Sequence, residues 1–175
     1  MEIGIVIKQG ISENQVKLVY LGIGSNLGNK FLNIEKAKSY LYENNIQLIN
    51  SSSYYETPSW PNPRFPKFIN IIVKIRTKLD YLELFYICKK IENKLGRKNS
   101  PKNSPRICDI DIIDFDNKII KKEIQIPHKL MHIRNFVLFP LFEIDKNWKH
   151  PVLKKNIKKL IFSLPIKDIR SIKQI

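Results

Sequence analysis

The chain has 175 residues, of which 43% are hydrophobic and 27% are charged, and its formal net charge is +15. This length fits one domain and excludes a second catalytic domain, and the apolar fraction excludes an intrinsically disordered chain. The positive charge favours a polyanionic partner, but composition alone does not choose between nucleic acid, a membrane surface and a phosphorylated metabolite.

Residues 1–17 are expected to be a leader of unknown role. Glu2 stands where a signal peptide carries positive charge, and the apolar run after it is shorter than a signal peptide requires. No stretch of the sequence approaches the roughly 18 consecutive apolar residues of a membrane span. Cys88 and Cys108 lie far apart without a Cys-x-x-Cys pair, which is typical of buried free thiols in a reducing compartment. The sequence therefore predicts a cytoplasmic protein with no membrane partner.

The first part of the domain alternates strand and helix. Leu18 to Ile23 is an apolar run that predicts a buried strand, and Gly22 to Gly28 predicts a tight turn into a helix. Apolar residues at intervals of three and four predict this helix from Phe31 to Leu41. Ile46 to Tyr55 predicts a second strand. Residues 57–66 contain four prolines, so they are expected to form an irregular loop.

The second part begins with a third strand, predicted from Phe68 to Ile75. Asp80, with Glu83 three residues later, predicts a capping box that opens a helix running to Leu95. Gly96 predicts the end of this helix, and a basic polar loop follows it.

A β-branched run from Arg106 to Phe115 predicts the fourth strand. Asp116-Asn117 is a turn signal, so residues 118–120 are expected to return as a hairpin partner of that strand. Three further elements are predicted, a short extended segment at residues 124–126 and helices at residues 136–144 and 154–164.

Strand, helix, strand, strand, helix, strand is the order of a ferredoxin-like split βαβ sandwich. The expected fold class is therefore α+β, with helices packed on an antiparallel sheet and additions at the C-terminal end. The domain is expected to span residues 18–164. Residues 165–175 are expected to be a tail outside this pattern, and no function is assigned to them.

Two acidic residues on the fourth predicted strand are the most informative feature of the sequence. Successive strand residues alternate faces, so Asp109 and Asp111 share one face, with Cα atoms roughly 6.5 to 7 Å apart. Mg²⁺ is commonly held by one or two carboxylates together with substrate phosphates. A half-solvated strand whose acids pair with lysines would produce the same pattern, so the motif alone leaves both possibilities open. Arg97 and Arg106 favour the first, because a guanidinium binds phosphate through two parallel hydrogen bonds.

Four other residues carry less information when each is taken alone. Glu92 sits late on a predicted helix, where one Glu is most often a surface charge. His128 follows a proline, and a lone His is more often structural than catalytic. Phe68 and Phe136 are expected to be core aromatics by default.

Taken together, these segments resemble the 6-hydroxymethyl-7,8-dihydropterin pyrophosphokinases of folate biosynthesis, in order from about Val19 to about Phe162. The Arg-x-x-Asp-x-Asp and Pro-His motifs are the most specific. The matching segments are Gly24–Leu27, Ser53–Pro58, Phe68–Asn70, Glu92–Arg97, Pro105–Ile113, Ile126–His128 and Arg134–Glu143.

The resemblance implies transfer of pyrophosphate from ATP to the hydroxymethyl group of the pterin, with two Mg²⁺ ions held by Asp109 and Asp111. The catalytic residues that it implies are Arg97, Arg106 and Asp111. The nucleotide-binding residues that it implies are Glu92, Arg97, Arg106, Ile112, His128 and Arg134. The pterin-binding residues that it implies are Thr57, Pro58, Phe68, Asn70 and Phe136. The residue chemistry agrees with these roles, because an Asn amide matches an aminopyrimidinone edge and aromatic rings stack on a flat heterocycle.

The sequence departs from the family pattern in four places. Asn99 stands where a second basic residue is common, and the loop of residues 98–104 is one residue short and lacks a Trp-Gly pair. Lys129 replaces a common aromatic residue, and Trp60 occupies a position that is more often aliphatic. These departures concern how the loop closes and which residue caps the pterin.

Two other functions stay open as alternatives to this one. A ferredoxin-like basic domain can bind RNA through aromatic residues on its sheet, but no predicted strand carries a ribonucleoprotein motif. An inactive homologue that only binds pterin or nucleotide is the second alternative. The expected partners are ATP and 6-hydroxymethyl-7,8-dihydropterin, with no nucleic acid, and the expected state is a monomer.

Overall fold

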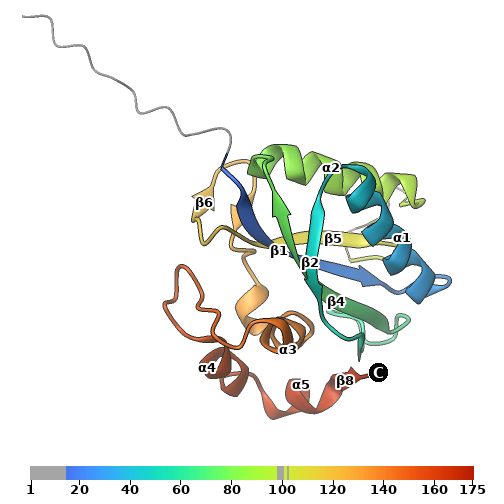
Figure 1. The fold of residues 1–175 in the computed structure, drawn as a ribbon. Helices are drawn as coiled ribbons and strands as arrows, with labels where there is room; N and C mark the ends of the chain where they lie inside the picture. Colours follow the sequence, from blue (N-terminus) through green and yellow to red (C-terminus); the bar gives the residue numbers. More distant parts are fainter. Residues whose placement is uncertain (1–14, 98–100, 102) are drawn as a thin grey trace, which may run out of the picture.

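The computed structural model describes residues 15–97, 101 and 103–175, and its helices and strands follow the order expected for a split βαβ sandwich (Figure 1). The first half consists of β1 (Lys17–Ser25), α1 (Lys30–Glu43), β2 (Gln47–Ser51), β3 (Tyr55–Thr57), β4 (Phe68–Thr77) and α2 (Tyr81–Lys94). The second half consists of β5 (Asp109–Phe115), β6 (Ile120–Lys121), β7 (Gln125–Ile126), a 3-10 turn η1 (Met131–Ile133), α3 (Asn135–Ile144), α4 (Ile157–Phe162), α5 (Ile166–Ser171) and β8 (Lys173–Gln174).

The main sheet is antiparallel throughout. Its strand order is β5-β1-β4-β3-β8, and β2 pairs with the same edge of β4 as β3 does. Numbered by the four strands of the split motif, this is the order 4-1-3-2 of a ferredoxin-like sheet, so the predicted α+β sandwich is confirmed.

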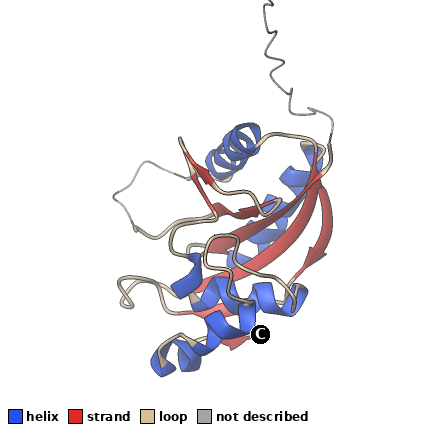
Figure 2. Cartoon of the chain, turned by 90° about the vertical axis from the view of Figure 1, so that its left-hand side faces the viewer, coloured by secondary structure: helices blue, strands red, loops and turns tan. Residues whose placement is uncertain are grey.

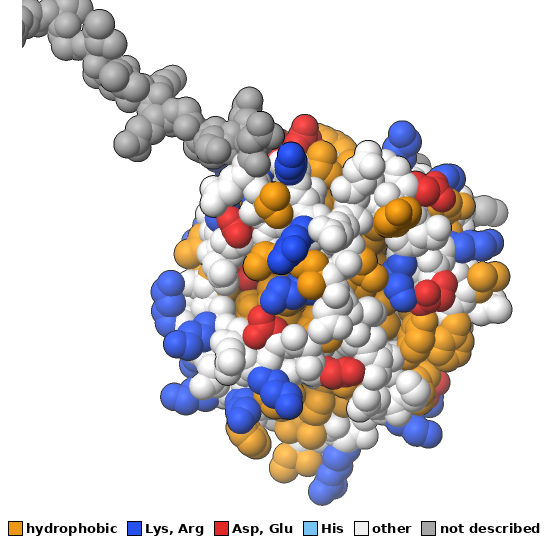
Figure 3. Space-filling model, viewed as in Figure 1, with side chains coloured by type: hydrophobic (Ala, Val, Ile, Leu, Met, Phe, Trp, Pro, Cys, Tyr) orange, Lys and Arg blue, Asp and Glu red, His pale blue; other side chains and the backbone are white. Residues whose placement is uncertain are grey.

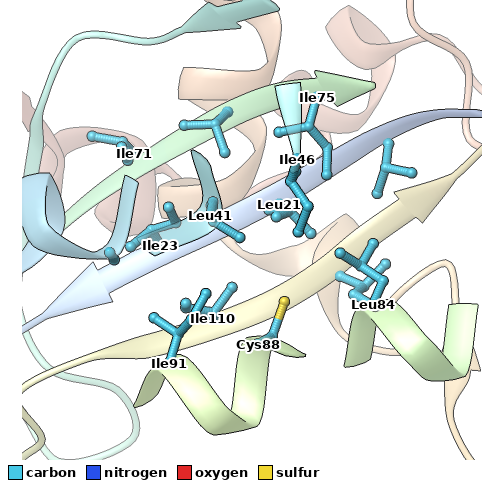
Figure 4. Packing of buried hydrophobic residues seen from close by; sticks show 14 of the residues in the cluster. Leu21, Ile23, Leu41, Ile46, Ile71, Ile75, Leu84, Cys88, Ile91 and Ile110 are labelled. Atoms are coloured by element: carbon cyan, nitrogen blue, oxygen red, sulfur yellow. The ribbon is translucent and has the colours of Figure 1, made fainter. Parts of the chain in front are cut away.

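One face of the sheet packs against α1 and α2. Helix α2 begins with the predicted capping box, in which Asp80 accepts from the Glu83 backbone and Glu83 accepts from the Asp80 backbone. The buried stripes of both helices meet the apolar residues of β1, β4 and β5 and form the main core (Figure 4). The core residues that the close view labels are Leu21, Ile23, Leu41, Ile46, Ile71, Ile75, Leu84, Cys88, Ile91 and Ile110.

The opposite face packs against α3 and α4, so that helices lie on both sides of the sheet (Figure 2). Tyr20, Ile72 and Ile113 project from three strands of the sheet into this second cluster, where they join Leu138 and Leu141 of α3. No helix in the described part of the chain is long and apolar enough to cross a membrane.

Several predicted elements differ from the structure. The strand predicted from Ile46 to Tyr55 is two strands, because the chain breaks at residues 52–54, where the Ser52 hydroxyl accepts a hydrogen bond from Ile72 N. The predicted turn at Asp116-Asn117 is present, with both residues in the left-handed region, but the predicted hairpin is wrong. β6 pairs with β7 in a separate small sheet, and the outer edge of β5 instead receives a hydrogen bond from His128 N to Ile113 O.

At both ends of the chain the structure differs from the predicted domain bounds. Residues 1–14 of the leader lie outside the described residues, whereas Lys17 already belongs to β1. The segment predicted to be a tail is part of the fold instead, because β8 pairs with β3 at the edge of the main sheet. The helix expected at residues 154–164 begins only at Ile157, after Lys154 in the left-handed region.

Candidate active site

A cavity of about 420 Å³ opens on the sheet face that carries α3. Strands β1, β4 and β5 supply its floor, and α3, the loop after β3 and the segment before β5 supply its walls. Eleven of the residues that the sequence nominated line this cavity: Thr57, Pro58, Phe68, Asn70, Arg97, Arg106, Asp109, Asp111, His128, Arg134 and Phe136. Glu92 and Ile112 do not line it.

Two glycines of β1 keep the floor open. A Cβ atom on Gly24 would lie 2.7 Å from Asn70 Oδ1 and 3.4 Å from Phe68 Cδ1, and one on Gly22 would lie 3.3 Å from Ile113 Cδ1. Both glycines were predicted to lie in a turn, but they lie within β1, and the turn comes later at Gly28. The two glycines are two residues apart, so they share one face of a strand, and this spacing is the sequence feature that could have predicted an open surface there.

Asp109 and Asp111 lie on one face of β5, directly opposite the two glycines of β1. Asp109 pairs in register with Gly24, and Asp111 pairs with Gly22. The intervening Ile110 is 1% exposed and belongs to the core on the other side of the sheet. Both carboxylates therefore point into the cavity, as the alternation of strand residues predicted.

Asp109 is well compensated by positive charge. Arg97 Nη1 lies 2.8 Å from Asp109 Oδ1, and Arg106 Nη1 lies 3.1 Å from the same oxygen. Burial alone would raise the pKa of the Asp109 carboxyl, but Arg106 and Arg97 outweigh burial and hold this pKa below its usual value. Asp109 is therefore a carboxylate at neutral pH.

Glu92 supports this arrangement from behind the cavity wall. It is 1% exposed, so it is not the surface charge that one helical Glu usually is. Its carboxylate accepts from Ile110 N at 2.7 Å and from Lys89 Nζ at 2.8 Å, and it also pairs with Arg97. Glu92 thus joins α2 to β5 and fixes the guanidinium that contacts Asp109.

Asp111 is much less compensated. Its nearest cation among the described residues is Arg134, whose Nη1 lies 3.9 Å from Asp111 Oδ2, and the imidazole Nε2 of His128 lies at the same distance. Burial and the negative charge of Asp109 raise the pKa of Asp111 to about 6. Burial, helped by Arg134, lowers the pKa of His128 to about 4, so this imidazole is neutral at pH 7 and offers Asp111 no charge.

This uneven pair of carboxylates fits a hard cation. Asp109 and Asp111 occupy neighbouring positions of one strand face, Asp111 has no cation closer than 3.9 Å among the described residues, and carboxylate oxygens are the ligands that Mg²⁺ prefers. No group of three or more His, Cys, Asp or Glu side chains within the described ranges could hold a metal alone. The pair therefore suits an ion that completes its coordination with water and phosphate oxygens.

The other end of the cavity is aromatic and amide-lined. Phe68 and Asn70 come from β4, Thr57 ends β3, and Phe136 lies in the first turn of α3. Asn70 is 7% exposed and donates from Nδ2 to Thr57 Oγ1 at 3.2 Å. Its Oδ1 faces the space above Gly24. This end can accept a flat ring and pair with its polar edge.

Asn26, which was not predicted to be a site residue, connects the two ends of the site by hydrogen bonds. It is 2% exposed and donates from Nδ2 to Ser59 Oγ at 3.2 Å and to Pro66 O at 3.1 Å, both in the loop after β3. It also accepts from Arg106 N at 2.7 Å and donates its own N–H to Arg106 O at 3.1 Å. One amide thus positions the aromatic end relative to Arg106.

A second hollow of about 270 Å³ adjoins the cavity and contains Ile112, which is 6% exposed. The two spaces share Lys89, Asp111 and His128. Its other lining residues are Phe85, Ile110, Ile124, Gln125, Ile126 and Lys129.

The lining residues of the main cavity that were not nominated include Lys89 and Trp60. Lys89 lies on α2 three residues before Glu92, and this spacing could have predicted the ion pair between them. Trp60 entered the sequence predictions only as a departure from the family pattern. Asn99 and part of its loop lie outside the described residues, so the shortening of this loop stays a prediction.

The sequence matches a known protein family over most of its length. Residues 20–146 match the family described as 7,8-dihydro-6-hydroxymethylpterin-pyrophosphokinase. The 2-amino-4-hydroxy-6-hydroxymethyldihydropteridine pyrophosphokinase of Aquifex aeolicus is 37% identical over 141 residues, which cover 80% of this chain and 88% of that protein. The enzyme of the same name from Haemophilus influenzae is 38% identical over 71% of this chain and 79% of that protein.

Some relatives are much longer than this chain. The folic acid synthesis protein FOL1 of Dictyostelium discoideum is 38% identical over 85% of this chain, but the match covers only 22% of that protein. Among solved structures, the Plasmodium falciparum HPPK-DHPS with pterin and p-hydroxybenzoate aligns with a TM-score of 0.72 at 18% identity, over 94% of this chain and 48% of that one. The structural similarity supports the fold assignment, whereas membership of the family rests on the sequence matches.

Proposed function

The chain belongs to the 7,8-dihydro-6-hydroxymethylpterin-pyrophosphokinase family, and from this membership we infer that it is an ATP-dependent pyrophosphokinase of folate biosynthesis. The hydroxymethyl oxygen of the dihydropterin forms a bond to the β-phosphorus of ATP. The bond from that phosphorus to the oxygen bridging the α-phosphate breaks, AMP leaves, and the hydroxyl proton is lost. The products are AMP and the pterin pyrophosphate.

One observation carries the assignment of the site. Asp109 and Asp111 lie side by side in the same cavity as the aromatic and amide side chains that suit a flat ring. A metal–triphosphate site and a heterocycle site are thus adjacent, and adjacency of the two reactants is what phosphoryl-type transfer chiefly requires.

Asp109 and Asp111 are the residues that would hold Mg²⁺, and we propose two ions bound with ATP. Bound magnesium would neutralise phosphate charge and orient the triphosphate. Asp109 forms ion pairs with Arg97 and Arg106, so both guanidinium groups would lie next to the phosphates that this site would bind. Arg97, Arg106 and Asp111 are the proposed catalytic residues, because they would contact the transferred group or its metal.

The rest of the ATP molecule, beyond its triphosphate, would extend from the two carboxylates toward the second hollow. Asp111 and His128 line both spaces, and Ile112 supplies apolar surface in the hollow. Arg134 lies on the same side of Asp111 as His128 does. Glu92 would act through Arg97, which it pairs with, so its proposed contribution to nucleotide binding is indirect.

The pterin would lie between Phe68 and Phe136, with its aminopyrimidinone edge at Asn70. An Asn side chain offers two donors and one acceptor to such an edge. Thr57 and Pro58 would form the wall beside it. The cavity glycines leave the floor flat enough for the ring, since a side chain at Gly24 would collide with Asn70.

We also propose that the chain acts as a monomer in the cytoplasm, without nucleic acid. The two cysteines are free and buried, and burial raises the pKa of each thiol to about 12, as suits inert thiols in a reducing compartment. Lysines and arginines on the face in Figure 3 are spread among acidic and apolar side chains and form no single basic track. This distribution gives an RNA-binding function no support from that face.

Product analysis tests the proposed function. Purified protein is mixed with ATP, Mg²⁺ and 6-hydroxymethyl-7,8-dihydropterin, and the nucleotides are separated by chromatography. One AMP per pterin consumed is the expected result, whereas ADP would indicate ordinary kinase chemistry. Pterin binding without AMP release would identify an inactive homologue. Omission of the pterin is the control, because AMP must then not form.

A further inference from the structure

We propose that Trp60 is a substrate-binding residue that closes the outer side of the pterin site and favours a flat aromatic ring there. The proposal rests on the proposed function, because it assigns Trp60 to the same heterocycle. It goes beyond the pterin-binding residues that the family resemblance implies, because Trp60 is not among them.

Trp60 is exposed, whereas the other tryptophan of the chain is buried. Its exposed fraction is 54%, whereas that of Trp148, the other tryptophan of the chain, is 4%. Trp148 donates from Nε1 to Asp114 and packs in the second core cluster. Trp60 lines the cavity instead, together with Thr57 and Phe68, which flank its loop in the sequence. An indole exposed at a cavity edge presents an unburied aromatic face to a ligand.

The loop that carries Trp60 is anchored directly beside it. Ser59 is 5% exposed, and its hydroxyl donates to Pro66 O at 2.6 Å. Asn26 donates to the same hydroxyl oxygen and to the same carbonyl. These contacts close the two ends of the loop on each other and on β1. The indole thus extends from a fixed base, which lowers the entropic cost of its contact with a ligand.

Arg134 connects Trp60 to the charged half of the site. Its guanidinium carbon lies 5.6 Å from the centre of the Trp60 ring and 5.5 Å from the centre of the Phe136 ring. Both distances lie within the range of a cation–π contact. The Nε of Arg134 is buried and has no hydrogen-bond partner among the described residues. Arg134 therefore contacts aromatic rings from two sides of the cavity and also faces Asp111.

The neighbouring loop supplies no ring that could do the same. Residues 97–106 contain only Arg, Lys, Asn, Ser and Pro. The aromatic residues that line the cavity are Trp60, Phe68 and Phe136. With Phe68 and Phe136 assigned to the two faces of the pterin, Trp60 is the remaining aromatic side chain of the cavity and is available to the edge of the ring.

Substitution at Trp60 tests the proposal by separating the two substrates. We expect Trp60→Leu to raise the pterin KM and the calorimetric pterin Kd, measured with Mg²⁺ and α,β-methylene-ATP present, by about threefold to tenfold, from the loss of an aromatic contact at the edge of the ring. The KM for ATP should change less than about twofold, and Trp60→Phe should restore most of the pterin affinity. Phe65→Leu is the matched control, because Phe65 is an exposed aromatic residue of the same loop that does not line the cavity.

A Trp148→Phe variant gives a second, spectroscopic test, because Trp60 is then the only tryptophan. Pterin should change its emission saturably, with a midpoint at the calorimetric Kd. Unchanged pterin affinity in Trp60→Leu, or equal losses for pterin and ATP, would overturn the role of Trp60 while AMP release by the wild type still upheld the enzyme. If the wild type neither bound pterin nor released AMP, the proposed function itself would fail.

Discussion

Replacing Asp111 by Asn should stabilise the ligand-free protein while it abolishes turnover. Asn keeps the shape of the side chain and removes its charge. In the wild type, burial and the neighbouring Asp109 raise the pKa of Asp111 from 3.8 to about 6, so the folded chain holds this carboxylate at a cost. At about 1.36 kcal/mol per pKa unit, the cost approaches about 3 kcal/mol. Because 35% of the side chain is exposed, solvent screening reduces the expected gain to about 1–2 kcal/mol.

The pH dependence of this gain has a definite sign. The folded-state pKa of Asp111 lies above its unfolded value, so between about pH 4 and pH 6 the folded state binds more protons than the unfolded state. The free energy of unfolding of the wild type therefore falls, relative to that of Asp111→Asn, as the pH rises through this interval. The difference between the two proteins should be near zero below about pH 4 and complete above about pH 7.

Urea denaturation at several pH values, in buffer with a metal chelator, measures this difference. Asp109→Asn is the matched control and should behave in the opposite way. Arg106 and Arg97 hold the pKa of Asp109 below its unfolded value, so its stabilising contribution is present above about pH 4 and is lost as the pH falls through the folded-state pKa. A lower free energy of unfolding for both variants at pH 8 would refute the uneven charge balance on which the metal site depends.

Three further perturbations probe other parts of the site. Arg106→Ala should lower kcat by about 10³- to 10⁵-fold, measured as AMP release, because a guanidinium on the transferred phosphates is lost. Asn26→Ala should lower the free energy of unfolding by about 1–3 kcal/mol in urea denaturation, because it leaves buried partners in two segments unsatisfied. Asn70→Ala should raise the pterin Kd by about tenfold or more in calorimetry, with little change in nucleotide affinity, because the polar edge of the ring loses its partners.

Each of these has a result that would contradict it. Near-normal turnover would remove Arg106 from the catalytic residues, and Arg64→Ala, an exposed arginine outside the cavity, controls for loss of charge. Wild-type stability of Asn26→Ala would mean that its hydrogen bonds do not hold the two segments. Equal weakening of pterin and nucleotide binding by Asn70→Ala would indicate a general structural defect rather than a pterin contact.

The arrangement of the fold could be predicted because its elements have local signals. The Asp80–Glu83 capping box gave the start of α2, and strand alternation placed Asp109 and Asp111 on one face. The hairpin after β5 could not be predicted in the same way. Its turn has the expected backbone, but which strand pairs with residues 120–121 depends on competing long-range contacts that no local pattern records.

Much of the site could be nominated from the sequence because of the family resemblance rather than from residue patterns alone. Eleven of the thirteen nominated residues line the cavity. The two exceptions are buried elsewhere. Glu92 lies behind the wall of the main cavity, and Ile112 lies in the adjoining hollow. Asn26 and Trp60 were missed because their contacts join segments that are far apart in the sequence, Asn26 to Arg106 and Trp60 to Arg134. Such couplings appear only once the chain is folded.

The most direct measurement is metal binding with nucleotide bound. Mn²⁺ replaces Mg²⁺, and its bound fraction is measured by electron paramagnetic resonance in the presence of α,β-methylene-ATP. The wild type is predicted to retain two ions per chain, and Asp109→Asn and Asp111→Asn should each weaken this retention by at least about tenfold. If both variants bound metal and nucleotide as the wild type does, the two carboxylates would not be the metal ligands.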